Sequence, residues 1–378
     1  MGKSVEERLN LIERNTEEIL GKDDLVKLLE TGEPINHYIG FEISGRIHIG
    51  TGLMCMSKVK DFMDAGINCS IFLADWHSWI NDKLGGDRAI IKEASNYFKE
   101  GLKASLKAVG GDPDKVKFVL GTELYHNADD YWATVIEVSK NTTLNRIVRS
   151  TTIMGRKEGE NIDFAKLIYP PMQVADIFYQ GIHLAHAGID QRKAHVVAID
   201  VAKHLKIKPL KNAKGEVIKP VAIHHHLLLG LQKPQQWPVP KENLQELWSS
   251  MKMSKSIPDS AIFVTDEPDL IKKKIQKAFC PEKDVEFNPV LDYAKSLVFR
   301  DENAALEITR PEKYGGNKTY NSYQALADDY AEGKLHPMDL KSGVAAAITK
   351  MLEPVRQHFE KPAIKAMKEK MDQITVTR

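Results

Sequence analysis

The chain has 378 residues, of which 42% are hydrophobic and 28% charged, and its basic and acidic residues leave a formal net charge of +1. This composition excludes wholesale disorder and favours two domains. The balanced charge excludes a polybasic arm as the main means of holding an anionic partner. No apolar run is long enough to span a membrane. The N-terminal segment lacks an apolar signal core, and the three cysteines show neither zinc nor disulfide spacing, so we expect a cytoplasmic protein.

Strand and helix patterns alternate along the first two thirds of the chain. Strands are predicted at 36–42, 67–75, 116–123, 182–190 and 221–229, and helices at 52–65, after an N-cap at Asp87, and at 191–205. Such alternation predicts an α/β fold with a doubly wound parallel sheet that binds ligands at the carboxyl ends of its strands.

The composition changes in the Pro- and Gln-rich segment 232–240, which is followed by a basic segment at 251–256. Beyond Asp266, which we interpret as an N-cap just before Pro268, the pattern is mostly helical. We therefore expect a Rossmann-like domain over 1–260, with a connective insertion at about 110–185, and an all-α domain over 261–378. The tail 361–378 has no predicted structure.

Two short segments carry chemistry. In the first, Ile47-His48-Ile49-Gly50-Thr51, a histidine and a glycine lie at a strand-to-helix turn. The free N–H groups and the dipole of a helix N-terminus favour an anion, and a glycine lets a phosphate approach the backbone. Taken alone, such a segment is more often a turn glycine beside a surface histidine.

The second segment, Lys252-Met253-Ser254-Lys255-Ser256, follows the last predicted strand of the sheet. Two lysines with hydroxyls between them can surround a polyphosphate with donors, although a solvated basic loop is the common alternative. The chain contains neither GxxxxGK[ST] nor GxGxxG, which weakens kinase-like and dehydrogenase interpretations. Because both segments follow parallel strands, we expect them at the same edge of the sheet.

Together the two segments resemble the HIGH and KMSKS signatures of class I aminoacyl-tRNA synthetases. The second matches fully, whereas Thr51 stands in the first where the signature has its last histidine. Three further segments, 38–42 (YIGFE), 169–176 (YPPMQVAD) and 188–193 (GIDQRK), are similar to tyrosyl-tRNA synthetases of the archaeal and eukaryotic type, over about residues 10–358. The resemblance implies a homodimer that forms tyrosyl-adenylate from tyrosine and ATP and then charges the 3′ end of tRNA(Tyr).

The same resemblance implies roles for individual residues. The catalytic residues would be His48, Gly50, Thr51, Lys252 and Lys255. Tyr38 and Asp176 would bind the substrate phenol, with Tyr169, Gln173 and Gln191 at its amino end and Glu42 assisting. ATP would contact Gly40, His48, Gly50, Asp190, Met253, Ser254 and Lys255, with Asp190 at the ribose. The tRNA would contact Arg149, Arg192 and Lys193 at its acceptor end, and Tyr314, His336 and Asp339 in the helical domain, which would read the anticodon.

Several inferences come from the residues themselves. Pro170 and Pro171 are expected to open a helix on which Gln173 and Asp176 share a face. Arg146, Arg149 and Arg156 have the spacing of a basic helical stripe, which suits RNA phosphates or simply solvent. Adjacent strand residues point to opposite faces, so the run 224–226 (HHH) is not expected to bind a metal. No protein metal site is predicted, and Mg²⁺ would arrive on the ATP phosphates.

Three alternatives stay open at this point. A tryptophanyl-tRNA synthetase shares the architecture, although Tyr38 with Asp176 suits a phenol better than an indole. A non-catalytic tRNA-binding relative would more often lack His48 or the lysines. A nucleotidyltransferase also uses a His-Gly turn but needs no tRNA-reading domain.

Overall fold

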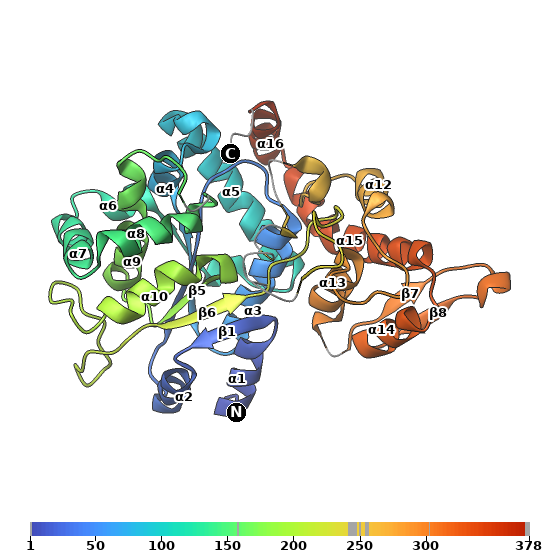
Figure 1. Cartoon of the computed structure of the whole chain (residues 1–378), viewed down its shortest axis with the longest axis horizontal. Helices are drawn as coiled ribbons and strands as arrows, with labels where there is room; N and C mark the ends of the chain where they lie inside the picture. Colours follow the sequence, from blue (N-terminus) through green and yellow to red (C-terminus); the bar gives the residue numbers. More distant parts are fainter. Residues whose placement is uncertain are drawn as a thin grey trace.

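The computed structural model describes residues 2–156, 159–240, 248, 251–253, 257–301 and 303–374. Its larger lobe is built on a six-stranded sheet, and a smaller lobe of mainly helices lies beside it (Figure 1). The strands of the sheet are β1 (Thr16–Leu20), β2 (Asn36–Phe41), β3 (Asn68–Leu73), β4 (Lys117–Leu120), β5 (Leu184–Gly188) and β6 (Val221–His225). Among the described residues, no helix is long and apolar enough to cross a membrane.

The strand order is β1-β6-β5-β2-β3-β4, and β2 to β6 run parallel, which confirms the predicted Rossmann-like class. β1, which the sequence analysis missed, pairs antiparallel with β6 at the edge. Its sequence TEEIL has no buried residue, so it lacks the apolar run that marks an inner parallel strand. The ends of β2, β5 and β6 meet at one edge, as a parallel sheet requires.

Helices cover both faces of the sheet. The larger lobe contains α1 (Val5–Glu13), α2 (Lys22–Thr31), α3 (Cys55–Asp64), α4 (Asp75–Ile80), α5 (Arg88–Ala108), α6 (Gly121–Tyr125), α7 (Asp129–Lys140), α8 (Leu144–Ser150), α9 (Ala165–Tyr179) and α10 (Arg192–Val201). Successive strand residues enter different cores: Ile39 packs in the cluster that holds α3 and α5, and Tyr38 in the cluster that holds α7, α9 and α10. This period of two explains why both faces of the sheet are buried.

Several predicted boundaries in this lobe are wrong, and the strand expected at 221–229 ends at His225. The strand expected at 116–123 ends at Leu120, because α6 begins at Gly121. Pro170 and Pro171 lie inside α9, which begins five residues earlier, at Ala165. A proline has no N–H to donate within a helix. The apolar helix nevertheless continues through the pair, since most of its residues are buried.

The smaller lobe contains α12 (Pro268–Lys277), α13 (Pro289–Ser296), α14 (Tyr323–Ala331), α15 (Pro337–Phe359) and α16 (Pro362–Gln373), with β7 (Leu306–Ile308) and β8 (Lys318–Tyr320). The antiparallel β7–β8 pair corrects the expectation of an all-α unit. The N-cap of α12 is Glu267, not Asp266, whose buried carboxylate instead binds Arg46 and Lys274.

The two lobes are joined closely. α15 and α16 both pack against α5 of the larger lobe. The backbone N–H of Ile49 donates to the Ile262 carbonyl at 2.9 Å, and that of Val264 donates to the Ile47 carbonyl at 2.9 Å. The stretch that enters the smaller lobe is therefore bonded directly to the His48 turn.

Candidate active site

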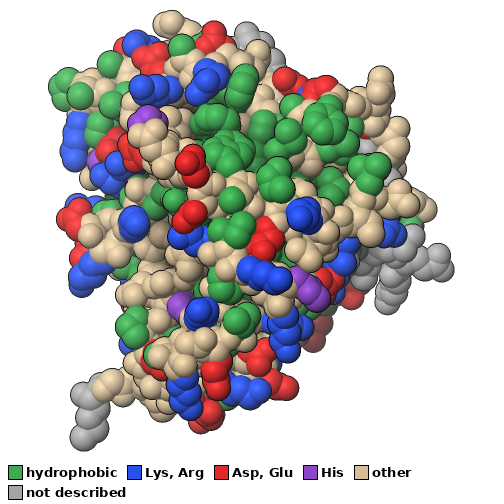
Figure 2. Space-filling model, turned by 90° about the vertical axis from the view of Figure 1, so that its left-hand side faces the viewer, with side chains coloured by type: hydrophobic (Ala, Val, Ile, Leu, Met, Phe, Trp, Pro, Cys, Tyr) green, Lys and Arg blue, Asp and Glu red, His purple; other side chains and the backbone are tan. Residues whose placement is uncertain are grey.

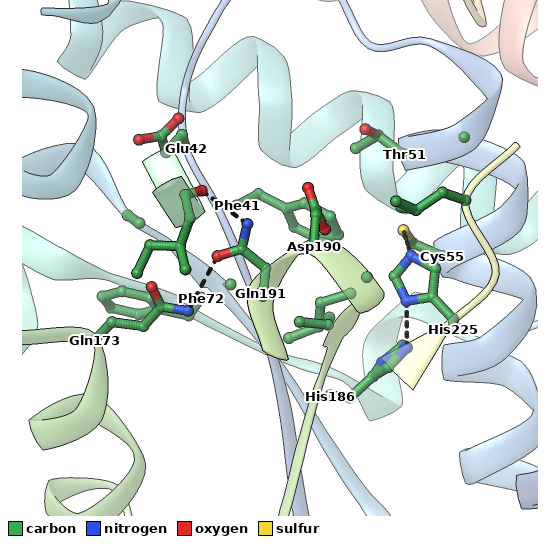
Figure 3. Close-up of a pocket in the computed structure, with 18 of the residues that line it drawn as sticks. Phe41, Glu42, Thr51, Cys55, Phe72, Gln173, His186, Asp190, Gln191 and His225 are labelled. Carbon is green, nitrogen blue, oxygen red and sulfur yellow. Dashed lines mark hydrogen bonds between the residues drawn. The ribbon is translucent and has the colours of Figure 1, made fainter. Parts of the chain in front are cut away.

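One cavity lies at the carboxyl ends of β2, β3, β5 and β6 (Figure 3). It collects most of the residues that the sequence analysis assigned to tyrosine and ATP. Its lining includes Tyr38, Gly40, Glu42, His48, Gly50, Thr51, Tyr169, Gln173, Asp176, Asp190, Gln191, Lys252 and Met253. Ser254 and Lys255 lie outside the described residues.

A buried carboxylate marks one end of the cavity. Asp176, on α9, is 1% exposed, and its Oδ1 accepts a hydrogen bond from the Tyr125 hydroxyl at 2.8 Å. Burial raises the pKa of Asp176 well above its usual value, although hydrogen bonds from Tyr125 and Tyr131 act in the opposite direction. Tyr38, 3% exposed, lines the same cavity, and burial raises the pKa of its hydroxyl. Such an end suits a ligand that carries one hydroxyl on an apolar body.

Two amides on neighbouring helices face the middle of the cavity. Gln191 Nε2 donates to the Ile153 carbonyl at 2.9 Å, and Gln173 Nε2 donates to Gln191 Oε1 at 3.4 Å (Figure 3). Glu42, at the end of β2, accepts from Asn81 Nδ2 at 2.8 Å. The oxygens of these groups create a region that is rich in acceptors, which suits an ammonium.

The His48 turn leads into a π-helical turn, Gly50–Met54, and then into α3. The backbone N–H of Thr51 donates to His48 Nδ1 at 3.3 Å, which fixes the imidazole against the helix start. A Cβ on Gly50 would lie 3.0 Å from two atoms of that ring, and one on Gly52 would lie 2.4 Å from Val264 Cγ1. The glycines are therefore required by close approaches, and they leave the turn open to an anion.

A lysine and an aspartate meet opposite this turn. Lys252 Nζ binds Asp190 Oδ2, and the Lys252 backbone bridges to Leu229 just after β6. Burial acts to raise the pKa of Asp190, but the Lys252 ammonium outweighs it and the pKa is lowered. A Cβ on Gly188 would lie 2.6 Å from Asp190 Oδ1, so a side chain at this position would clash with the carboxylate. The pair offers a carboxylate for hydroxyls and an ammonium for phosphate oxygens.

The three consecutive histidines have separate partners. His224 Nε2 bonds His195, His225 Nδ1 bonds His186 at 2.8 Å, and His226 lies between two carboxylates. The predicted alternation of side chains is thus present in the structure, and the three rings do not converge.

The predicted basic stripe is wrong. Helix α8 ends at Ser150, and Gly155 adopts a left-handed conformation, so Arg156 does not continue that helix. Arg146 instead pairs with Asp200, and Arg156 Nε donates to Asn81 Oδ1 at 3.3 Å. Arg149 remains exposed, and Lys193 Nζ donates to its carbonyl at 3.1 Å, whereas Arg192 pairs with Glu18 at 2.8 Å.

The residues predicted to read the anticodon lie in the smaller lobe. Tyr314 is 62% exposed in the turn before β8, and His336 is the exposed N-cap of α15, whose first turn contains Asp339. Arg310 connects these segments, because its Nε donates to the Gly316 carbonyl and its Nη1 to the carbonyl of residue 334.

Sequence reasoning missed several residues of the cavity. His77, Tyr125 and His195 are buried at its edge or line it, yet none belongs to a segment that stood out. His77 follows the end of a predicted strand, and His195 lies one helical turn after Gln191. These positions in the predicted elements could have placed both residues near the cavity.

Comparison with known proteins identifies the family. The chain belongs to the family of class I tRNA synthetases for tryptophan and tyrosine (W and Y), whose sequence profile matches residues 30–353. It is 59% identical to the tyrosine–tRNA ligase of Thermococcus kodakarensis and 58% identical to that of Pyrococcus abyssi, over 94% of this chain and 96% of each relative.

Solved structures of tyrosine and tryptophan enzymes differ in how closely they resemble this chain. A tyrosyl-tRNA synthetase of Pyrococcus horikoshii, complexed with L-tyrosine, has a TM-score of 0.93 at 55% identity, over 97% of this chain and 100% of that chain. A tryptophanyl-tRNA synthetase of Aeropyrum pernix K1 has a TM-score of 0.66 at 18% identity, over 100% of this chain and 94% of that chain, and shares the fold alone. Within the family, the likeness is to the archaeal tyrosine enzymes.

Proposed function

We propose that this chain is a tyrosine–tRNA ligase. It activates L-tyrosine with ATP to tyrosyl-adenylate and pyrophosphate, and then transfers the tyrosyl group to the 3′ end of tRNA(Tyr). The observation that carries this proposal is a single cavity that joins the buried Asp176–Tyr38 end to the Lys252–Asp190 end. The near-complete match to archaeal tyrosine–tRNA ligases supports it.

The amino acid lies with its phenol between Tyr38 and Asp176. The phenol hydroxyl donates to Asp176 Oδ2, the carboxylate oxygen other than the one that accepts from Tyr125, and it accepts from the Tyr38 hydroxyl. Phenylalanine would leave both groups buried and unsatisfied, which costs more than the hydrogen bonds themselves contribute. Tyr169, Gln173 and Gln191, with Glu42 nearby, hold the amino end.

In the activation step the tyrosine carboxylate attacks the α-phosphorus of ATP in line with the leaving group. A new C–O–P link forms, and the bond from the α-phosphorus to pyrophosphate breaks. The nucleophile is already an anion, so no general base is required. Catalysis is positioning together with stabilisation of charge on the leaving group.

The residues that stabilise this charge are His48, the helix start at Gly50 and Thr51, and Lys252. Ser254 and Lys255, beyond the described residues, complete the set in this proposal. Asp190 accepts from the ribose, with Gly40 and Met253 beside the nucleotide. Mg²⁺ enters on the ATP phosphates, which are its usual partners in nucleotide sites.

The transfer step places the tRNA acceptor end near Arg149, Arg192 and Lys193. In the smaller lobe, Tyr314 and His336 stack on an unpaired anticodon base, and Asp339 accepts a hydrogen bond from a guanine edge. The Arg310 hydrogen bonds support this reading, because they hold the Tyr314 turn beside the segment that leads to His336.

We also propose that the enzyme is a homodimer that pairs through the face formed by α7, α8 and the segment before α9. Figure 2 shows hydrophobic side chains gathered on this side of the molecule. The exposed apolar residues from these elements are Ile136, Leu144, Val148 and Phe164, which are 61%, 67%, 38% and 76% exposed. A patch of this kind is typical of a protein interface. Leu144→Glu should shift the sedimentation coefficient toward a monomer, and an unchanged value would contradict this face.

The proposal also divides the chain into two units. The catalytic unit covers 1–260, with an insertion at about 110–185, and the anticodon-binding unit covers 261–378. The position of the predicted anticodon residues in a separate lobe supports it (Figure 1). A cytoplasmic location stays a prediction from the sequence.

The test is amino-acid-dependent ATP–pyrophosphate exchange with the full chain. Tyrosine should stimulate exchange, and tryptophan and phenylalanine should not at comparable concentrations. Exchange that depends on tryptophan would replace this proposal with the tryptophan enzyme. An absence of exchange with every amino acid, despite tRNA binding, would favour a non-catalytic relative.

A further inference from the structure

A chain of hydrogen bonds determines which atom of Gln173 faces the cavity. The Ile153 carbonyl can only accept, so the atom of Gln191 that bonds it at 2.9 Å is the amide nitrogen. Gln191 Oε1 therefore accepts from Gln173 Nε2. Gln173 Oε1 is left as a buried acceptor without a donor among the described residues.

A second chain, made of different residues, begins at Glu18 on β1. Burial acts to raise the pKa of Glu18, but Arg192 and His224 together lower it, so the group is a carboxylate and accepts from His224 Nδ1 at 2.9 Å. Burial lowers the pKa of His224, so its ring carries a single proton, on Nδ1. His224 Nε2 is thus an acceptor, and His195 Nδ1 donates to it at 3.0 Å.

The second chain therefore ends on a bare nitrogen. His195 is 1% exposed, and burial lowers the pKa of its ring well below the usual value, so it carries only the proton on Nδ1. Its Nε2 is an unprotonated, buried acceptor that has no donor among the described residues. Glu18 determines this tautomer from the far end of the chain of bonds.

Both chains end at the same cavity. His195 lies one helical turn after Gln191 on α10, and it lines the cavity together with Gln173. Two desolvated acceptors cannot satisfy each other, and each is costly to leave unpaired. A ligand that satisfies both must bring at least two donors to the cavity.

The chemistry of the ligands favours one group. Carboxylate and phosphate oxygens only accept, the phenol hydroxyl is held at Asp176, and the ribose is held at Asp190. The adenine amino group brings two N–H donors but no charge, whereas an α-ammonium brings three N–H donors and a positive charge. An imidazole nitrogen can also bind a metal ion, but the described residues hold no cluster of three His, Cys, Asp or Glu that could share one.

We propose that His195 Nε2 is a further acceptor for the α-ammonium of the bound amino acid, beside Gln173 Oε1. His224 and Glu18 are positioning residues, because they hold the His195 tautomer that presents a lone pair to the cavity. This inference rests on the proposed function, since it requires an amino acid as the substrate.

A matched pair of variants separates the two nitrogens of His195. In His195→Asn the amide reaches only the Nδ1 position, so the donor to His224 is kept and the cavity acceptor is lost. In His195→Gln the longer side chain places a polar atom at the Nε2 position. A matched pair of ligands does the same for the substrate: L-tyrosine carries the ammonium, and 3-(4-hydroxyphenyl)propanoate lacks it.

Calorimetric titration of the original protein and the two variants with both ligands then gives six affinities. In His195→Asn the Kd for tyrosine should rise roughly 10- to 100-fold, the usual effect of losing a hydrogen bond to a charged group. The Kd for the propanoate should stay within about twofold of its original value. His195→Gln should recover most of the affinity for tyrosine.

Glu18→Gln tests the positioning role. The ¹⁵N signals of His195 should show an unprotonated Nε2 in the original protein and a mixture of tautomers in the variant. The affinity for tyrosine should fall less than in His195→Asn. An unchanged ¹⁵N pattern would overturn the role of Glu18.

Equal weakening of both ligands in His195→Asn would overturn the inference, because it would show a purely structural role. So would a rise in the KM for ATP alone, which would place His195 at the nucleotide. Failure of the proposed function looks different: the original protein would then bind neither phenol ligand.

Discussion

Asp176→Ala is the most informative change to the cavity. Asp176 is 1% exposed, and one of its oxygens already accepts from the Tyr125 hydroxyl at 2.8 Å. The other oxygen is the acceptor proposed for the substrate phenol. Alanine removes both oxygens, so the phenol of a bound tyrosine would be buried without an acceptor.

The size of the effect follows from these contacts. A hydrogen bond contributes about 0.5–1.5 kcal/mol, or about 1.5–3 kcal/mol where the acceptor is charged, and a buried hydroxyl without a partner costs about 1–3 kcal/mol more. The kcat/KM for tyrosine should therefore fall roughly 10- to 10⁴-fold. Phenylalanine has no hydroxyl to offer the carboxyl group of Asp176. The variant lacks that carboxyl group, so bound phenylalanine no longer leaves it without the substrate hydrogen bond. Its kcat/KM should stay constant or rise, so the preference for tyrosine collapses.

The assay is ATP–pyrophosphate exchange with tyrosine and with phenylalanine, together with tRNA binding measured by filter retention. Asp61→Ala is the matched control. Asp61 is another fully buried carboxylate, on α3, and it pairs with Arg300 and Arg14 away from the cavity. That variant should lose thermal stability and keep the preference for tyrosine.

Two results would refute the reasoning. A parallel loss of activity with both amino acids in Asp176→Ala would show that the residue only supports the fold. Loss of the preference in Asp61→Ala would show that discrimination follows general stability rather than the phenol contact.

Three further predictions concern other parts of the molecule. Lys252→Met should slow adenylate formation in single turnover by roughly 10²- to 10³-fold, since it removes a cation that stabilises the leaving group, while the Kd for tyrosine changes little. His226 lies between two carboxylates, with Nε2 at 2.7 Å from Asp292 and Nδ1 at 2.6 Å from Glu17. Burial acts to lower the pKa of His226, but the two carboxylates raise it to about 10. This pair of contacts stabilises the fold fully below about pH 6.5, the unfolded value, and the contribution, up to about 5 kcal/mol, is lost as the pH rises toward 10. Denaturant unfolding should show that His226→Gln flattens this loss. Asp339→Ala should weaken tRNA charging and spare pyrophosphate exchange, because it lies in the other lobe.

Each of these has a contrary outcome. An unchanged single-turnover rate in Lys252→Met would remove the lysine from the activation step. The same decline in stability between pH 6.5 and 10 in His226→Gln would assign that decline to other groups. A loss of exchange in Asp339→Ala would mean that the residue acts on the cavity and not on the anticodon.

Much of the fold could be predicted from local sequence patterns. The five parallel strands were predictable because each is a mostly apolar run between helical segments, which is what burial on two faces demands. Their carboxyl ends meet at one edge by the geometry of a parallel sheet. Tyr38 and Glu42 therefore line one cavity together with Asp190, although Asp190 is distant from them in sequence.

Elements that lack such a pattern were missed. β1 is polar because it pairs at the sheet edge, and β7 and β8 are three residues each, too short for a periodic signal. The spacing of Arg146 and Arg156 suggested a stripe, but the helix ends between them, and each guanidinium binds a nearby acceptor. Spacing predicts a shared face only where one helix continues.

The chain order of apolar runs and turns therefore decided the class of fold and the edge at which ligands bind, and the resemblance of the signature segments predicted the chemistry of the two ends of the cavity. These properties depend on neighbours along the chain, which a sequence displays directly. The tautomer of His195 is different, because it is imposed by Glu18 through His224, and Glu18 and His224 are 206 positions apart. Which buried nitrogen carries a proton is determined by contacts in space, so only the folded structure could decide it.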